Sequence, residues 1–237
     1  MRRLTFSTVP IALAIALLAP RAEADVVTIP VLEDVAPYSF VPNALRWANP
    51  ALWAFQALDE NELPHDFESY LWFDVSLDDV PAGQYVTQAL LRVTYSFDAS
   101  GFGDTSEDPG TLDCHEVIED WDHQTLTWNN RPDIDPPFDS VPGIDGYGVL
   151  LCDATEAVLG WLYGVYPNYG VALTSPTART IGMHGSEAAV ADALKPALVL
   201  TTEVPEPGVA GALGVGAITL GAVARRRRPR ANHGAPR

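Results

Sequence analysis

Residues 70–77 read YLWFDVSL and residues 89–97 read ALLRVTYSF, and both stretches alternate between apolar and other positions. One face of the first stretch consists of Leu71, Phe73, Val75 and Leu77. The apolar face of the second consists of Ala89, Leu91, Val93, Tyr95 and Phe97. A period of two residues is what a strand with one buried face requires. Both stretches therefore predict half-buried antiparallel strands.

The rest of the central chain continues this pattern more weakly. Further strands are expected at 112–118, 125–128, 147–152, 169–174 and 197–201, separated by loops rich in Gly, Pro, Asp and Ser. One short helix is expected at 154–163, with Asp153 as its N-cap and Glu156 completing a capping box. Many short strands and one helix predict an all-β fold, an antiparallel β-sandwich or jelly roll. No linker divides residues 25–202, so we expect one domain there.

The first 24 residues have the three parts of a secretory signal peptide. Arg2 and Arg3 precede an apolar run over residues 9–18, and the segment closes with the small-x-small pattern of Ala22 to Ala24. The apolar run is too short to span a bilayer. We therefore expect residues 1–24 to be cleaved and the protein to be exported.

The charge of the central region limits its partners. Between Asp25 and Thr202 the chain has five basic and 28 acidic residues. Such an acidic surface disfavours binding to nucleic acid and to anionic membrane surfaces. It is compatible with binding to cations or neutral polymers and with a salty medium. The alternative is that the acidic residues serve only to keep the protein soluble.

The two cysteines, Cys114 and Cys152, both lie in the exported region. An even pair in an oxidising compartment favours one disulfide. In the chain-entropy model, closing this loop stabilises the fold by about 4 kcal/mol.

The sequence offers little support for catalysis. It contains no GxSxG, HExxH or P-loop motif. A pair of catalytic carboxylates stays open as an alternative, because their separation in space decides it. Calcium is the one cofactor that the sequence suggests, through the hard oxygen ligands of Asp98, Asp104, Glu107 and Asp108. Asp133, Asp135 and Asp139 form a second acidic cluster. Neither cluster has EF-hand spacing, so solvated loops are the alternative.

Three tryptophans are candidates for an exposed aromatic platform that stacks against sugar rings. Trp72 points away from the apolar face of its strand, and Trp47 and Trp53 lie in an irregular early segment. Packing of Trp72 beneath a loop is the alternative. Trp121, Trp128 and Trp161 are expected in the core.

Residues 116–132, EVIEDWDHQTLTWNNRP, resemble a known family. The matching positions are Trp121, Thr127, Trp128, Asn129, Asn130 and Pro132. This pattern is similar to the DNRLRE domain, a β-sandwich module of exported microbial proteins related to carbohydrate-binding modules. The resemblance extends over about residues 35–202, although the hexapeptide that names the family is absent. It implies a β-sandwich that binds polysaccharide.

The C-terminal segment, residues 203–237, resembles a PEP-CTERM sorting signal. Its elements are VPEPG at 204–208, with Pro205, Glu206 and Pro207, then an apolar stretch, then Arg225, Arg226, Arg227 and Arg228. The apolar stretch would span roughly 26 Å as a transmembrane helix, with the arginines on the cytoplasmic side. The resemblance implies processing by an exosortase-like enzyme after transient membrane anchoring. A permanent anchor is the alternative.

These features together predict an exported, non-enzymatic protein of the cell envelope, surface or extracellular matrix that binds polysaccharide. Two alternatives remain at this point. One is a polysaccharide-degrading enzyme with a carboxylate pair, and the other is a calcium-stabilised structural surface protein.

Overall fold

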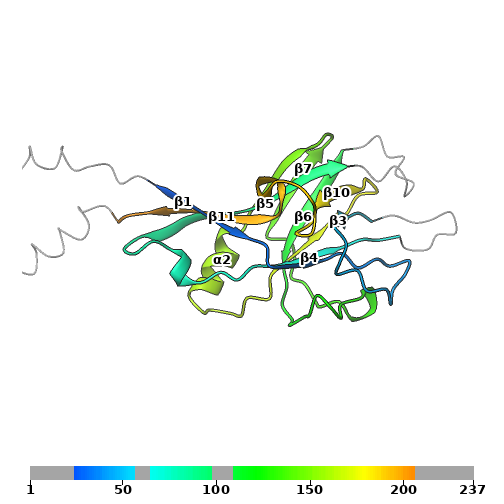
Figure 1. The fold of residues 1–237 in the computed structure, drawn as a ribbon, viewed down its shortest axis with the longest axis horizontal. Helices are drawn as coiled ribbons and strands as arrows, with labels where there is room; N and C mark the ends of the chain where they lie inside the picture. Colours follow the sequence, from blue (N-terminus) through cyan, green and yellow to red (C-terminus); the bar gives the residue numbers. More distant parts are fainter. Residues whose placement is uncertain (1–23, 57–64, 98–108, 206–237) are drawn as a thin grey trace, which may run out of the picture. The chain divides into compact units, whose positions relative to one another are not determined.

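The computed structural model describes residues 24–56, 65–97 and 109–205. Within them, residues 25–202 form one compact unit built from two antiparallel sheets and one short α-helix. This is the predicted all-β class, a β-sandwich (Figure 1).

Each sheet brings together strands that are distant in the sequence. The first sheet has the order β1 (Asp25–Pro30), β11 (Ala197–Glu203), β5 (Tyr85–Phe97), β10 (Ile181–His184) and β3 (Ala51–Ala54), and β8 (Gly148–Asp153) also pairs with β5. The second has the order β2 (Glu33–Val35), β4 (Ser69–Trp72), β9 (Val171–Thr174), β6 (Gly110–Glu116) and β7 (Asp139–Ile144). We call them sheet A and sheet B.

The core contains apolar side chains from both sheets. Its largest fully buried members include Leu52, Tyr95, Leu91 and Met183 from sheet A and Leu71, Leu112 and Leu173 from sheet B. The disulfide between Cys114 of β6 and Cys152 of β8 lies in this core and joins the two sheets, with 6.5 Å between the Cα atoms. The pairing agrees with the expectation from the even cysteine count.

Ser69 makes a second connection between the sheets. Its buried hydroxyl, on β4, accepts from the backbone N–H of Trp53 on β3 at 2.8 Å and donates to the Trp53 carbonyl at 2.8 Å. We expect Ser69→Ala to lower the free energy of unfolding by about 1–3 kcal/mol, because two buried backbone groups lose their partner. Urea denaturation measures this. Ser140→Ala, at an exposed position, is the control, and an equal effect of both substitutions would contradict the assignment.

The first strand of the opening pattern is shorter than predicted. Strand β4 ends at Trp72, and Leu77 lies in a one-turn 3-10 helix, η1 (Leu77–Asp79), with 55% of its surface exposed. Ser76 and Asp79 form a capping box around this turn, so local polar groups end the alternation. The second strand is confirmed, and β5 begins earlier than predicted, at Tyr85.

Two other local predictions are corrected. The helix, α2 (Thr155–Leu162), has Ala154 as its N-cap and lacks the capping box with Glu156. The Asp153 carboxylate still accepts the backbone N–H of Thr155, at 3.0 Å. Residues 125–128 form no strand. They lead into a 3-10 turn, η3 (Trp128–Asn130), in which the Asn130 side chain accepts the backbone N–H of Thr127 at 2.6 Å.

Candidate functional site

A long loop crosses the outer face of sheet B. Residues 117–135, here called the crossing segment, are closed at their base by bonds from the Ile118 N–H to the Asp133 carbonyl (3.1 Å) and from the Asp135 N–H to the Glu116 carbonyl (3.0 Å). Val117 and Leu126 of the segment pack with Val35, Tyr70 and Ala172 of sheet B and form a second, smaller core. The outer face of this sheet is therefore covered at its centre.

Three side chains, spaced two residues apart, follow the outer face along β4. Tyr70 is fully buried beneath the crossing segment, Glu68 precedes it and Trp72 follows it, and both of these are half-buried. Four residues of extended chain span about 13 Å. The crossing segment thus separates two clefts, one containing Trp72 and the other containing Glu68.

The first of these, the aromatic cleft, has a volume of about 290 Å³. Its lining residues are Glu33, Trp72, Asp120, Trp121, Asn168 and Tyr169. Trp72 and Trp121 are half-buried, and their indole N–H groups donate to the carbonyls of Asn168 (3.2 Å) and Tyr169 (2.7 Å). One turn therefore holds both indole rings in place, while carboxylates and an amide lie beside them.

This turn depends on Gly170. The glycine has φ +88°, and a Cβ at this position would overlap the backbone carbonyl of Leu71. The Asn168 side chain fixes the turn by accepting the Gly170 N–H at 3.0 Å and donating to the Phe73 carbonyl at 2.7 Å.

We expect Gly170→Ala to destabilise the fold by about 1–3 kcal/mol, because alanine is strained at positive φ and its methyl group meets backbone. Thermal unfolding and tryptophan fluorescence measure this, since the acceptors of both indoles would shift. Gly83→Ala is the matched control, with φ +81° and open space around its Cβ position. The contact with Leu71 would be refuted by equal losses in the two variants.

Trp47 lies close to the rim of the aromatic cleft. The Nδ1 atom of His123 lies 2.9 Å from a carboxylate oxygen of Glu33, and the His123 ring meets Trp47 edge-on with 6.5 Å between ring centroids. Trp47 has 48% of its surface exposed. The fold thus links Trp47 to the cleft of Trp72 through two intervening side chains.

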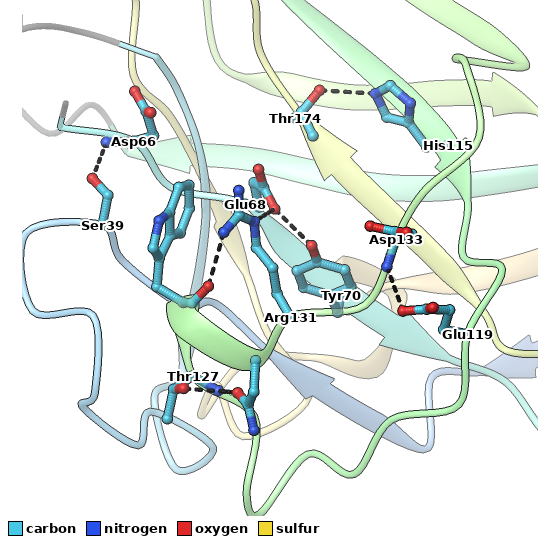
Figure 2. Close-up of polar contacts among 12 residues, drawn as sticks. Ser39, Asp66, Glu68, Tyr70, His115, Glu119, Thr127, Arg131, Asp133 and Thr174 are labelled. Carbon is cyan, nitrogen blue, oxygen red and sulfur yellow. Dashed lines mark hydrogen bonds and ion pairs between the residues drawn. The ribbon is translucent and has the colours of Figure 1, made fainter.

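The second cleft, here called the Arg131 cleft, has a volume of about 320 Å³. The Arg131 guanidinium carbon lies 3.9 Å from the centroid of the Trp128 ring, and its Nε atom lies 3.1 Å from a Glu68 carboxylate oxygen (Figure 2). The Tyr70 hydroxyl donates to the same Glu68 oxygen at 2.6 Å. Burial, followed by the negative charge of Glu68, raises the pKa of Tyr70, so its hydroxyl stays a neutral donor.

The three tryptophans predicted to form an exposed platform do not lie together on the surface. Trp72 lines the aromatic cleft and Trp47 lies next to it, but Trp53 is 8% exposed in the core on β3, so its place in an exposed platform is wrong. Trp161 is buried as expected. Trp121 and Trp128, also expected in the core, are half-buried and line clefts.

The candidate calcium ligands Asp98, Asp104, Glu107 and Asp108 lie outside the described residues. In the part of the chain that the structure describes, no three His, Cys, Asp or Glu side chains are grouped to bind a metal ion. Asp133, Asp135 and Asp139 therefore do not form such a group. The Asp139 carboxylate instead accepts the backbone N–H groups of Ser140 (2.8 Å) and Asp153 (2.7 Å).

The ends of the chain are described only in part. The arginine cluster at 225–228, Glu206 and Pro207 lie outside the described residues, as do residues 1–23 of the expected signal peptide, while Pro205 is exposed. No helix within the described ranges is long and apolar enough to cross a membrane.

Comparison with models of protein families gives a match for this chain. Residues 55–202 match the model of carbohydrate-binding module family 96 (CBM96). The chain belongs to the CBM96 family. This confirms the expectation of a sandwich of the carbohydrate-binding-module type. Comparison with curated proteins gives no match.

Several residues of the CBM96 clefts escaped the sequence reasoning, namely Glu33, Asp120, Trp121, Asn168, Tyr169 and Arg131. Nothing local marks Glu33, which reaches the cleft only because β2 pairs with β4.

Proposed function

We propose that this CBM96 protein binds a neutral polysaccharide in the aromatic cleft. The pair of half-buried indole rings, Trp72 and Trp121, supports the proposal most directly. Indole rings offer large apolar faces to the apolar faces of sugar rings. Carboxylates at the rim can accept hydrogen bonds from sugar hydroxyls, and an amide can both accept and donate them. A few polar groups among aromatic walls are typical of a ligand site.

The charge around the cleft selects the ligand class. Glu33 and Asp120 line it, Asp122 continues the same rim, and the five basic residues of 25–202 are outnumbered by 28 acidic ones. A polymer of uronic acids or sulfated sugars would meet like charge here, which costs binding free energy. Uncharged sugar units avoid this cost.

The proposed role is that of a non-enzymatic protein of the cell envelope, surface or extracellular matrix. Support comes from the family, whose name describes a binding module, and from the resemblance of residues 1–24 and 203–237 to export and sorting signals. Glu116 has a raised pKa, mainly through burial, as a catalytic acid would. It lines neither cleft, however, and its carboxylate accepts the Trp161 indole N–H at 2.8 Å. We therefore do not propose hydrolysis.

A glycan-array screen of the purified full chain, with and without calcium, tests the proposal. We expect binding to neutral glycans and none to polyuronates, with little effect of calcium. Failure to bind any glycan in either condition would sink the proposed function. Binding that requires calcium would favour the calcium-stabilised alternative, and release of reducing ends from a bound glycan would favour the enzyme.

A further inference from the structure

The Arg131 cleft has its own set of polar and aromatic groups, and none of its lining residues belongs to the aromatic cleft. Its lining includes one half-buried aromatic residue, Trp128, and the polar residues Gln56, Asp66, Glu68 and Thr174, whereas Phe55, Phe67 and Ser175 are buried. An indole ring beside polar groups that can bond to sugar hydroxyls is the chemistry invoked above for the first cleft. Arg131 also lines a second hollow, together with Tyr70, Pro132 and Asp133.

The polar groups of this cleft are held in fixed positions. Arg131 is fixed by the Glu68 carboxylate (3.1 Å), by the Trp128 ring (3.9 Å) and by the Trp128 carbonyl, which accepts from Nη1 at 2.8 Å. Glu68 is fixed in turn by the Tyr70 hydroxyl. Figure 2 shows Glu68 between Arg131 and Tyr70, with dashed lines to both. Groups held before binding lose little conformational entropy when a ligand arrives.

We propose that the Arg131 cleft is a second carbohydrate-binding site, and that the protein cross-links neutral polysaccharide chains by holding one in each cleft. The inference rests on the proposed function of the aromatic cleft. The two clefts lie on opposite sides of the crossing segment. Glu68, just before β4, and Trp72, at the end of β4, are separated by about 13 Å of extended chain. The covered Tyr70 between them keeps a chain in one cleft from continuing along the sheet into the other.

The charge of the Arg131 cleft selects the same ligand class. Arg131 is already paired with Glu68, and Asp66 adds a further carboxylate to the lining. An anionic sugar would therefore compete with Glu68 for the guanidinium, whereas hydroxyls can bond to both partners of the pair. The second site thus also favours uncharged sugar units.

Isothermal titration calorimetry of the full chain with cellohexaose, mannohexaose and xylohexaose tests the number of sites. We expect two oligosaccharides per chain for the hexasaccharide that binds, one for each cleft. Arg131→Ala and Trp121→Ala should each reduce the stoichiometry from two to one. Because Arg131→Ala removes the ion-pair partner of Glu68, Gln56→Trp is a second variant. It fills the same cleft from an exposed position and leaves the Arg131–Glu68 pair intact.

Cross-linking is tested with the matching soluble polymers, hydroxyethylcellulose, galactomannan and arabinoxylan. The wild type should raise the turbidity of the polymer that it binds, and each single-cleft variant should abolish this rise while still binding the polymer. One oligosaccharide per wild-type chain, or full stoichiometry and turbidity in Arg131→Ala and Gln56→Trp, would overturn the second site and leave the first intact. Absence of all binding would instead overturn the proposed function, and this inference with it.

Discussion

Replacing Trp121 by alanine is expected to weaken glycan binding at the aromatic cleft by about 30-fold, the equivalent of about 2 kcal/mol. The substitution removes one of the two indole rings of the cleft, together with its 2.7 Å hydrogen bond to the backbone carbonyl of Tyr169. Large effects of this kind are concentrated in tryptophans that form the centre of a site. Titration calorimetry with the best neutral oligosaccharide from the array measures the loss.

Two further variants separate stacking from general damage. Trp121→Phe keeps an aromatic face but loses the indole N–H, so we expect an intermediate loss. Tyr163→Ala is the matched control, because Tyr163 is 62% exposed and lines neither cleft. Wild-type affinity in Trp121→Ala, or an equal loss in Tyr163→Ala, would remove the indole pair from the binding site. The melting temperature of each variant shows whether the fold is intact.

Much of the fold could be predicted from alternation, because burial on one face of a strand acts on every second residue. The apolar face through Leu71 and Phe73 and the strand through Leu91 and Val93 were both found in this way. Short strands were harder. Strands β2 and β3 have three and four residues, too few to show a period, and they are extended because of the strands beside them.

The candidate site was predictable only where a side chain pointed away from the core and stayed uncovered. Trp72 met both conditions. Tyr70 also points outward, but the crossing segment buries it, and no local pattern reveals that covering. Trp121 was expected in the core, whereas it lies half-buried at the edge of the smaller core, where its indole N–H donates to the Tyr169 carbonyl. Whether a tryptophan supports a core or a cleft is thus a tertiary property.

The disulfide allows the largest stability prediction. Replacing Cys114 and Cys152 together by alanine is expected to lower the free energy of unfolding by about 4 kcal/mol, mainly because the unfolded chain gains the freedom of the opened loop. The two residues are separated by 38 positions, and their bond ties β6 of sheet B to β8 of sheet A. Alanine is preferred to serine, because both sites are buried and a hydroxyl would need a partner there.

Urea denaturation of the wild type, the double variant and the reduced wild type measures this effect. The reduced wild type should lose nearly as much stability as the double variant, and dithiothreitol should leave the double variant unchanged. Glycan affinity in dilute buffer should stay within about twofold of wild type, because neither cysteine lines either cleft and the bond lies in the core. A loss of stability below about 1 kcal/mol would show that packing between the sheets, rather than the covalent link, holds them together.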